Sequence, residues 1–309
     1  MNKQYYDVIV LGGGPAGMNA ALVLGRSRLE VLVLNAETPR NLVTTHSHGF
    51  LTQDGKHPSE ILSIAKKQLK KYPLVDYRVD RAIDLVQLEI GFKVITESNE
   101  YLSRRVIVAT GYKDNIDKLG IQGLREVYGK SVFPCPFCDG FEMSDRKLAV
   151  FGDANVGPMF AKIISNWSDD VVVVTNGEQI KDEQVLESLR RNKVSLIDKP
   201  IKDLVSKNGL LEKIVFEDGA SVSRDGGFIA DTRATESVDF LNKLKLPTSS
   251  GFIGMKSYKV DENKESPIKG LYIVGDARTG WSGVVSAAAE GSDVAASITH
   301  QIVAEKWIN

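Results

Sequence analysis

Cysteine is scarce in this sequence, which has 2 in 309 residues, and an excess of charge is missing, since the net charge at pH 7 is -1. A nearly neutral chain is a poor candidate for a protein that binds nucleic acid by bulk attraction. The sequence also lacks any run of the roughly 18 apolar residues that a membrane-spanning helix needs. Its apolar beginning is interrupted by Asp7 and by glycines, unlike a signal peptide. We therefore expect a cytoplasmic protein that binds neither nucleic acid nor membrane.

The length predicts two domains of ordinary size, because single hydrophobic cores rarely grow beyond about 250–300 residues. A hydrophobic content of 42% is ordinary for a folded globular protein. We therefore look for two folded units rather than for disorder.

Both cysteines lie in the segment Cys-Pro-Phe-Cys-Asp-Gly at residues 135–140. Two thiols at this spacing can close a disulfide and reopen it, and a helix start or a nearby charge that stabilises the thiolates makes the disulfide labile. Pro136 suits the first position of a helix, so we expect Cys135 at the cap. Asp139 is near enough in sequence to donate or accept the proton that exchange requires. The segment predicts a redox site with Cys135, Cys138 and Asp139 as catalytic residues.

Other interpretations of the pair have less support. A static structural disulfide is not expected in a reducing compartment. A zinc site would need further ligands such as His46 and His48, but neither a second Cys pair nor a His-x3-His pattern accompanies them. We expect no metal, and inert thiols stay open as an alternative.

A glycine-rich turn near the N-terminus indicates a dinucleotide site. The turn Gly-Gly-Gly-Pro-Ala-Gly at residues 12–17 follows an apolar run at 6–11 and precedes a helical stretch and a second apolar run at 31–34. Gly12, Gly14 and Gly17 have the spacing that permits a tight turn, backbone approach to a pyrophosphate and close packing of helix on strand. Asn35 stands where an acid usually binds a ribose and Glu37 comes two residues later, so either could bind.

Three further segments have features of the same site. Residues 39–55 form a polar loop that could contact a ligand or be an ordinary surface loop. A buried strand is predicted at 106–111, ending in Ala-Thr-Gly, and another at 271–276, ending in Gly-Asp before a helix that begins near Val284. An aspartate at a strand end can accept from a cofactor hydroxyl, and a helix N-terminus can face an anionic ring atom.

The second half of the chain repeats the strand, turn, helix, strand order of the first. A strand at 147–151, a turn at 152–157, a helix at 158–167 and a strand at 171–174 indicate a second nucleotide fold. Its glycine pattern is eroded, because Asp153 would repel a phosphate and Ala154 replaces a glycine. Glu178 could accept from ribose hydroxyls, which favours NADH, or the site could be weak or unused. Farther on, residues 204–219 predict a hairpin with Asp218-Gly219 as its turn.

Four motifs together, at residues 12–17, 109–111, 135–140 and 274–277, resemble the low-molecular-weight thioredoxin reductase family over essentially the whole chain. The resemblance implies an α/β fold of two Rossmann-like three-layer dinucleotide-binding domains, the second inserted into the first. The expected boundaries are 1–114 and 232–309 for the FAD-binding domain and 115–231 for the NAD(P)-type domain that carries the cysteines. It also implies a homodimer.

By the same resemblance, electrons pass from NAD(P)H to FAD, to the Cys pair and then to thioredoxin or a small disulfide. Cys138 would face the flavin, Cys135 would attack the substrate and Asp139 would be the acid. The second nucleotide site is expected at Gly152, Asn155, Gly157 and Glu178. The residues expected to bind FAD are Gly12, Gly14, Pro15, Ala16, Gly17, Asn35, Glu37, Arg40, Asn41, Thr45, His48, Ala109, Thr110, Gly111, Gly275, Asp276, Val284 and Val285.

The chain departs from the family pattern in two places. Residues 175–177 are Thr-Asn-Gly where a His-Arg-Arg segment usually binds NADPH, and residues 281–285 replace an Arg-Gln pair near the flavin. The loop at 45–55 and the Cys-Pro-Phe-Cys form resemble the branch of gliotoxin-type dithiol oxidases, which commonly has His where this chain has Asp139. Two alternatives therefore stay open. One is a small-molecule dithiol oxidase that uses oxygen, and the other is a reductase that takes electrons from ferredoxin or flavodoxin through the lysines at 66–71 and leaves the nicotinamide site unused.

Overall fold

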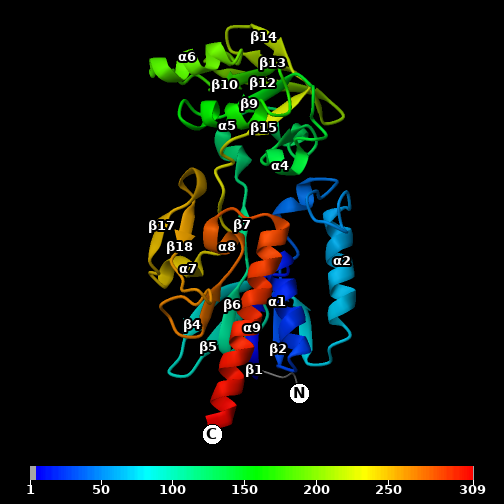
Figure 1. Ribbon diagram of the computed structural model, residues 1–309, viewed down its shortest axis with the longest axis vertical. Helices are drawn as coiled ribbons and strands as arrows, with labels where there is room; N and C mark the ends of the chain where they lie inside the picture. Colours follow the sequence, from blue (N-terminus) through cyan, green and yellow to red (C-terminus); the bar gives the residue numbers. More distant parts are fainter. Residues whose placement is uncertain (1–4, 309) are drawn as a thin grey trace. The chain divides into compact units, whose positions relative to one another are not determined.

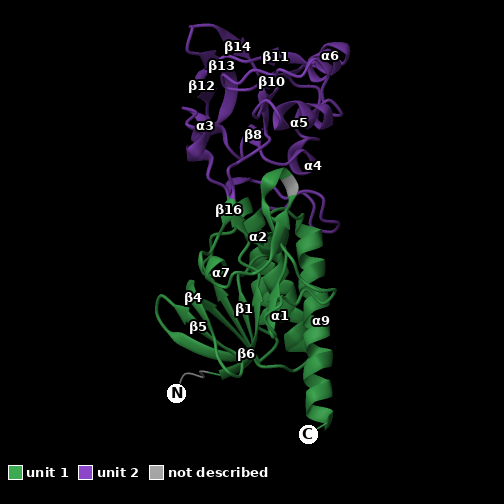
Figure 2. Cartoon of the chain, turned by 90° about the vertical axis from the view of Figure 1, so that its left-hand side faces the viewer, with its two compact units in different colours: residues 1–42, 58–113, 235–309 green, residues 43–57, 114–234 purple. Residues whose placement is uncertain are grey.

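The computed structural model describes residues 5–308 and divides them into two compact units. Unit 1 contains residues up to 42, residues 58–113 and residues from 235 onward, and unit 2 contains residues 43–57 and 114–234 (Figure 2). Unit 2 is thus inserted into the sequence of unit 1, and the fold is the expected α/β fold with two parallel-sheet Rossmann-like units. Residues 43–57 group with unit 2, whereas the sequence puts them with the first domain.

Unit 1 is built on a sheet in the order β3-β2-β1-β6-β5-β4, with β19 also paired to β6. β1, β2, β3, β6 and β19 are parallel, and β5 and β4 continue the sheet in antiparallel pairing. β2 and the carboxyl-terminal halves of β1 and β6 are apolar and buried, as parallel strands covered by helices are, whereas the edge strand β3 is only partly buried and carries Asp76 and Arg78. The strands are β1 (Tyr5–Leu11), β2 (Val31–Asn35), β3 (Val75–Val79), β4 (Ala82–Gln87), β5 (Phe92–Thr96), β6 (Glu100–Val108) and β19 (Leu271–Ile273).

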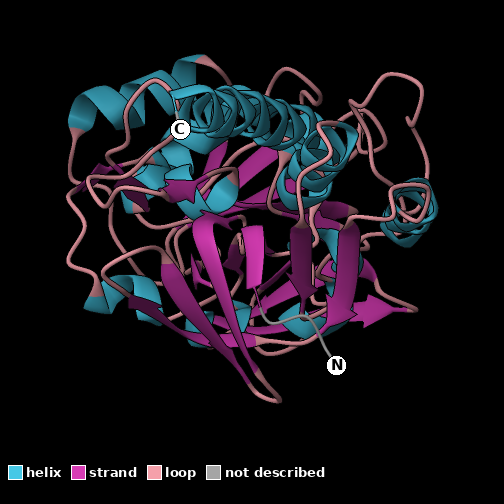
Figure 3. Cartoon of the chain, turned by 90° about the horizontal axis from the view of Figure 1, so that it is seen from below, coloured by secondary structure: helices cyan, strands magenta, loops and turns pink. Residues whose placement is uncertain are grey.

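The helices α1 (Pro15–Arg26) and α9 (Val284–Ile308) of unit 1 pack tightly against each other along one face of this sheet (Figure 1). A Cβ on Gly291 of α9 would lie 2.0 Å from the carbonyl oxygen of Ala16 in α1, so only glycine permits this approach. Figure 3 shows the helix that ends at the C-terminus, in cyan, on one side of the strands of unit 1, which are drawn in magenta. The helices of unit 1 are α1 (Pro15–Arg26), α2 (Pro58–Leu69), α7 (Phe240–Lys243), α8 (Asp276–Thr279), α9 (Val284–Ile308) and the 3-10 turn η3 (Phe252–Gly254); the 3-10 turn η1 (Arg40–Val43) spans the boundary at residue 42.

Two short strands in unit 1 mark where the chain leaves for unit 2 and where it returns. β7 (Tyr112–Lys113) pairs antiparallel with β16 (Thr235–Glu236). Within unit 2, the backbone N–H of Asn115 donates to the carbonyl of Thr232 at 2.9 Å. The outgoing and returning chains are therefore hydrogen-bonded neighbours in each unit. A separate hairpin of unit 1 joins β17 (Thr248–Ser250) and β18 (Lys256–Tyr258).

Unit 2 repeats the parallel arrangement with the sheet order β11-β10-β9-β15-β8. Its strands are β8 (Val132–Phe133), β9 (Leu148–Phe151), β10 (Val171–Val174), β11 (Ser195–Ile197) and β15 (Gly226–Ile229). Its helical elements are η2 (Ile116–Leu119), α3 (Leu124–Val127), α4 (Pro136–Asp139), α5 (Val156–Ile164) and α6 (Glu183–Arg191). The repeat of strand, turn, helix and strand that the sequence predicts is confirmed by β9, α5 and β10.

A three-stranded antiparallel sheet completes unit 2, with β12 (Ile201–Lys207), β13 (Leu210–Phe216) and β14 (Ser221–Ser223). The predicted hairpin turn at Asp218 and Gly219 is confirmed, since these residues join β13 to β14, but residues 204–219 also contain the β12–β13 hairpin, which the sequence pattern does not separate. The β12–β13 hairpin turns at Asn208 and Gly209, whose φ angles of 54° and 83° suit the tight turn that favours an Asn-Gly pair. Within residues 5–308, none of the helices is both long and apolar enough to span a lipid bilayer.

Candidate functional site

The two cysteines form a disulfide at the start of α4 in unit 2. Cys135 is the N-cap and Pro136 is the first helical residue, as the sequence predicts. The backbone N–H groups of Cys138 and Asp139 each donate to the carbonyl of Cys135 at 3.2 Å, which closes a single helical turn around the pair. Cys135 is 6% exposed and Cys138 is half-buried. The local backbone therefore holds both sulfurs in one short turn.

Asp139 ends α4 and directly follows Cys138 in the chain, so the redox turn carries a titratable carboxyl. Its carboxyl is buried, and burial is the largest cause that raises its pKa from 3.8 to about 7. The nearby Glu142 raises this pKa further by repulsion, while His48 lowers it. An acid that titrates near neutral pH can both donate and accept protons under ordinary conditions.

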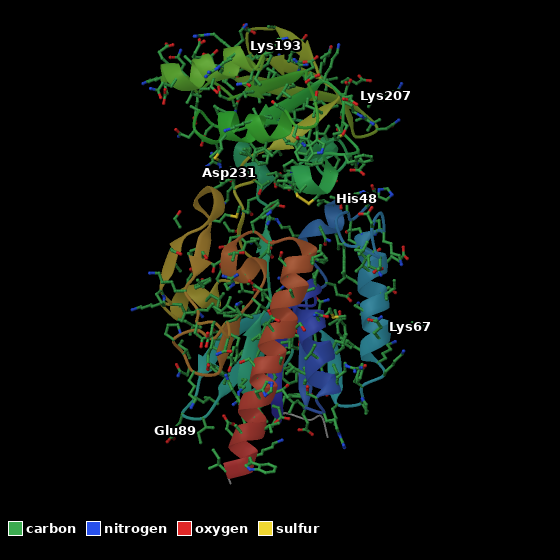
Figure 4. All side chains as sticks on the ribbon, in the orientation of Figure 1. His48, Lys67, Glu89, Lys193, Lys207 and Asp231 are labelled. Carbon is green, nitrogen blue, oxygen red and sulfur yellow. A yellow bond between two sulfur atoms is a disulfide. The ribbon has the colours of Figure 1, made fainter. Side chains whose placement is uncertain are left out.

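The segment at 43–57 belongs to the same unit as the disulfide. Nε2 of His48 is 3.4 Å from Oε1 of Glu142 and its Nδ1 is 3.5 Å from Oδ1 of Asp54. His48 is labelled in Figure 4, which draws the side chains as sticks. Thr45 is exposed, and its hydroxyl lies 2.9 Å from Nδ1 of His46. His48 and Thr45, which the sequence assigns to the FAD site, are thus found in the unit of the Cys pair, and their contact with a cofactor stays a prediction.

The glycine turn of unit 1 is a cradle that leaves no room for side chains at two positions. Gly12 has a φ of 111°, and a Cβ there would lie 2.2 Å from the carbonyl oxygen of Ala109. A Cβ on Gly17 would lie 2.0 Å from the carbonyl oxygen of Gly12. A Cβ on Gly14 would meet no described atom within 4 Å. The first and third glycines therefore fold the turn, and the second borders open space at the start of α1.

Asn35 holds the cradle in shape. Its Oδ1 accepts from the backbone N–H of Gly13 at 3.3 Å and from that of Glu37 at 3.0 Å, and its Nδ2 donates to the hydroxyl of Tyr77 at 2.6 Å. Glu37 itself pairs with Lys66. The sequence leaves open whether Asn35 or Glu37 binds the ribose. In the structure the side chain of Asn35 is hydrogen-bonded to the turn, whereas that of Glu37 is exposed and pairs with Lys66.

Arg40 and Asp276 meet from distant parts of unit 1. Nη1 of Arg40 donates to Oδ2 of Asp276 at 3.1 Å, and the guanidinium lies 4.7 Å from the ring centre of Trp281. The other carboxylate oxygen of Asp276 accepts from the backbone N–H of Ser282 at 2.6 Å and from its hydroxyl at 2.8 Å. The strand ends that the sequence singles out, after β1, β6 and β19, therefore lie at one edge of the sheet, because these strands are parallel neighbours.

Comparison with known proteins assigns the chain to a family. Residues 6–291 match the family model described as pyridine nucleotide-disulphide oxidoreductase. The chain belongs to this family.

Individual relatives agree with the assignment. The crystal structure of TrxB from Bacillus anthracis is 34% identical with a TM-score of 0.91, covering 98% of this chain and 100% of that chain. The thioredoxin reductase of Bacillus subtilis is 26% identical over 97% of this chain and 96% of that protein. Thioredoxin reductase aclD of Aspergillus oryzae is 26% identical over 98% of each chain. The protein is thus a thioredoxin reductase-like flavin disulfide oxidoreductase with a CxxC redox pair.

The family of pyridine nucleotide-disulphide oxidoreductases binds FAD, and the cradle of unit 1 fits that cofactor. Oγ1 of Thr110 is buried and has no hydrogen-bond partner among residues 5–308, and it follows Ala109, the residue that touches the cradle. A buried hydroxyl without a partner indicates that a missing group completes its hydrogen bonding. The positions of Ala16, Pro15, Gly111, Asn41, Val284 and Val285 beside the same strand ends and helix starts are compatible with the predicted set. Val285, in the first turn of α9, is 48% exposed.

The second nucleotide loop of this family is present in unit 2 with altered charge. Gly152 and Gly157 form its tight turn, since a Cβ on Gly152 would lie 2.9 Å from the Cα of Gly157. Oδ1 of Asp153 accepts from the backbone N–H groups of Asn155 at 2.8 Å and Val156 at 2.9 Å. These contacts put a carboxylate at the N-terminus of α5, where such loops usually receive a phosphate.

Glu178 adds a second carboxylate to this loop. It follows β10, and its Oε2 accepts from the backbone N–H of Ala154 at 3.1 Å. A carboxylate here can accept from free ribose hydroxyls and repels a 2′-phosphate. The carboxylates of Asp153 and Glu178 thus both contact backbone N–H groups of this loop.

Sequence reasoning missed three residues that organise the site in unit 1. Tyr77 orients Asn35, and Ser282 orients Asp276. Glu290 of α9 accepts from the backbone N–H of Gly275 at 2.7 Å and pairs with Arg278. The sequence shows Glu290 only as an acidic residue on the second turn of a helix that follows a Gly-Asp strand end. This pattern does not predict that Glu290 accepts from the backbone of Gly275.

Proposed function

We propose that the protein passes electrons from a reduced nicotinamide through FAD and the Cys135/Cys138 pair to the disulfide of a thioredoxin-like protein or to a small disulfide. The observation that carries the proposal is the closed disulfide in one turn with the buried Asp139, whose pKa of about 7 suits proton transfer at neutral pH. The names of the relatives as thioredoxin reductases support the choice of partner.

The exchange balances when the reduced pair meets a disulfide. In the proposed roles, Asp139 takes the proton of the Cys135 thiol, the resulting thiolate attacks one substrate sulfur, the substrate S–S bond breaks, and Asp139 gives that proton to the leaving sulfur. Asp139 then takes the proton of the Cys138 thiol, the thiolate of Cys138 attacks the Cys135 sulfur, and this second proton passes to the second substrate sulfur as it leaves, which restores the Cys135–Cys138 bond. The two thiols of the pair have lost two electrons and two protons, and the substrate has gained them.

FAD, when bound, supplies the two-electron carrier that the side chains lack. The cradle at Gly12, Gly14 and Gly17 would receive its pyrophosphate, with Thr110 and Asp276 available for its polar groups. Asn35 keeps the turn in the receptive shape, and Arg40 keeps the Asp276 carboxylate in place. Cys138 is the proposed partner of the flavin and Cys135 that of the substrate, as the family resemblance implies.

NADH is the proposed donor rather than NADPH. The loop of unit 2 presents the carboxylates of Asp153 and Glu178, and residues 175–182 contain no arginine that could neutralise a 2′-phosphate. In the second nucleotide site, Gly152 and Gly157 would form the turn, and Glu178 would accept from the adenosine ribose.

The remaining parts of the proposal come from the family resemblance. We propose a homodimer that works in the cytoplasm, where a thioredoxin-like partner is kept reduced. Measurement of the molar mass in solution tests the homodimer, and a monomer at micromolar concentration would contradict it.

The negatively charged loop at 152–157 in unit 2 favours a second candidate function, that of a dithiol oxidase. If its carboxylates keep nicotinamide out, a small dithiol could reduce the Cys pair, and oxygen could take the two electrons and two protons as hydrogen peroxide. The similarity of residues 45–55 to the gliotoxin-type branch points the same way. Oxygen consumption with a dithiol and without nicotinamide would favour this oxidase.

The donor is tested by anaerobic bleaching of the bound flavin. We expect NADH to bleach it at least about tenfold faster than NADPH, and reoxidation to follow addition of oxidised thioredoxin. The variant Glu178→Arg should narrow or reverse the preference, while Glu183→Arg, on the exposed start of α6, should leave it unchanged. Faster bleaching by NADPH would contradict the proposed donor. If neither nucleotide bleaches the flavin, the remaining functions are the dithiol oxidase and a reductase that takes electrons from ferredoxin or flavodoxin.

A further inference from the structure

His48 is enclosed between two carboxylates close to the redox turn. Its Nε2 is 3.4 Å from Glu142 and its Nδ1 is 3.5 Å from Asp54. The side chain of His48 is 21% exposed, against 43% for Glu142 and 64% for Asp54, so the imidazole is the most enclosed of the three. A histidine that contacts carboxylates through both ring nitrogens can carry a positive charge that both of them share.

The two carboxylates differ in their relation to Asp139. Glu142 follows α4 by three residues and acts on Asp139 as a like charge, while His48 acts on it as an opposite charge. Asp54 contacts the far ring nitrogen of His48, and the ring of His46 lies 6.2 Å from that of His48. The other titratable groups that act on Asp139 or contact His48 are therefore Glu142, Asp54 and His46.

We propose that His48 is a positioning residue of the redox site, which pairs with Glu142 and thereby sets the protonation of Asp139 during thiol–disulfide exchange. The inference rests on the redox role of the Cys pair. It assigns to the segment at 43–57 a part in the chemistry of cysteines that lie some ninety residues later in the sequence.

The direction of the effect follows from the charges. A cation at His48 offsets the repulsion from Glu142, so Asp139 can release its proton to a leaving sulfur at a lower pH than it otherwise would. Without the imidazole, Asp139 faces Glu142 alone and keeps its proton to higher pH. Without the Glu142 carboxylate, it loses its proton at lower pH.

The test titrates Asp139 in the flavin-loaded protein by carboxyl-carbon NMR, with its signal assigned by its loss in Asp139→Asn. The variant His48→Gln should move the midpoint upward by roughly one pH unit, and Glu142→Gln should move it downward. The variant His48→Lys, which keeps the positive charge, should return the midpoint to the value of the parent protein or below it. The rate at which the pre-reduced protein cleaves 5,5′-dithiobis(2-nitrobenzoic acid) should shift along the pH axis in the same directions.

Asp54→Asn is the matched control, because Asp54 is as close to His48 as Glu142 is but contacts the opposite ring nitrogen. It should move the midpoint of Asp139 upward by less than His48→Gln does, because the imidazole stays and loses one of the two carboxylates that share its charge. An unchanged midpoint in His48→Gln, or an upward shift that His48→Lys fails to reverse, overturns the inference.

The two proposals fail separately in this experiment. A parent protein that cleaves no disulfide at any pH contradicts the proposed function, while the NMR midpoints still decide the role of His48. Turnover in the parent protein with identical pH profiles in all variants contradicts the role of His48 alone.

Discussion

Arg40 donates to Asp276 across 236 residues of sequence, with 3.1 Å between Nη1 and Oδ2. The bond joins η1, which follows the second strand of the chain, to α8, which follows the last strand of the sheet. Both side chains are mostly enclosed, with 15% and 20% exposure, so the pair is less screened by water than a surface ion pair. The pair connects the segment after β2 with the segment after β19 in unit 1.

Replacement of Arg40 by Ala should therefore weaken both the fold and the flavin site. The carboxylate of Asp276 would lose a charged partner, which costs about 1–3 kcal/mol of the free energy of unfolding. Thermal melting and the fraction of flavin retained through gel filtration measure the two effects. The exposed pair of Arg125 and Asp117 supplies the control, since Arg125→Ala should change the free energy of unfolding by less than about 0.5 kcal/mol. Equal effects of the two replacements would contradict the connecting role of Arg40.

Replacement of Cys138 by Ser should separate flavin binding from disulfide chemistry. The cradle belongs to unit 1 and contains neither cysteine, so the variant should keep its yellow chromophore, while reduction of thioredoxin falls to background because no second thiol can close the Cys135 bond. Visible absorbance and a coupled disulfide-reduction assay give the two readouts. Substantial turnover in the variant would mean that the pair is not the electron carrier.

Asp139 should destabilise the native protein at neutral and alkaline pH. Its pKa is raised from 3.8 to about 7 in the folded state, so its contribution is most favourable below pH 4 and is lost as the pH rises through about 7. Asp139→Asn should accordingly raise the free energy of unfolding by roughly 2–4 kcal/mol at pH 8 and by much less at pH 4. Denaturant titrations at the two pH values measure the difference. A gain that is the same at both values would show that burial of the charge is not the cause.

Gly12 and Gly14 should respond differently to replacement by Ala. At Gly12 the new Cβ would collide with the backbone of Ala109 at a positive φ, which costs about 2–3 kcal/mol or more of the free energy of unfolding. At Gly14 the Cβ meets open space, so the apoprotein should stay stable while flavin affinity falls, because that space is where the pyrophosphate would come closest. Melting of the apoprotein and flavin titration distinguish the cases. A stable Gly12→Ala protein with normal flavin affinity would contradict the role of the cradle.

Local rules account for the parts of the fold that the sequence predicts well. The Cys135 cap follows from Pro136, and the strand, turn and helix of each unit follow from apolar runs interrupted by glycine. The sequence predicts the turn at Asp218 and Gly219 but misses the one at Asn208 and Gly209, because two Gly-containing turns lie ten residues apart and only the pairing of the strands shows that each closes a hairpin.

The long-range contacts could not be read from the sequence. The residues around His48 in the sequence do not indicate its contact with Glu142. Those around Asn35 do not indicate its hydrogen bond to Tyr77. The grouping of residues 43–57 with unit 2 likewise depends on tertiary packing, since their sequence neighbours on both sides belong to unit 1. Such contacts join side chains far apart in the chain, where periodicity and spacing carry no information.

Because β7 pairs with β16, the coding sequence for residues 114–234 could be removed or replaced as one piece. Because the departing and the incoming strand are adjacent, removal of everything between them leaves two ends that a linker of a few residues can rejoin. A different nucleotide-binding insert spliced at the same two points would find its entry and exit already side by side. Recombination at this junction is thus a route by which such a chain can exchange residues 114–234, including the Cys135–Cys138 pair, and keep the glycine cradle of unit 1.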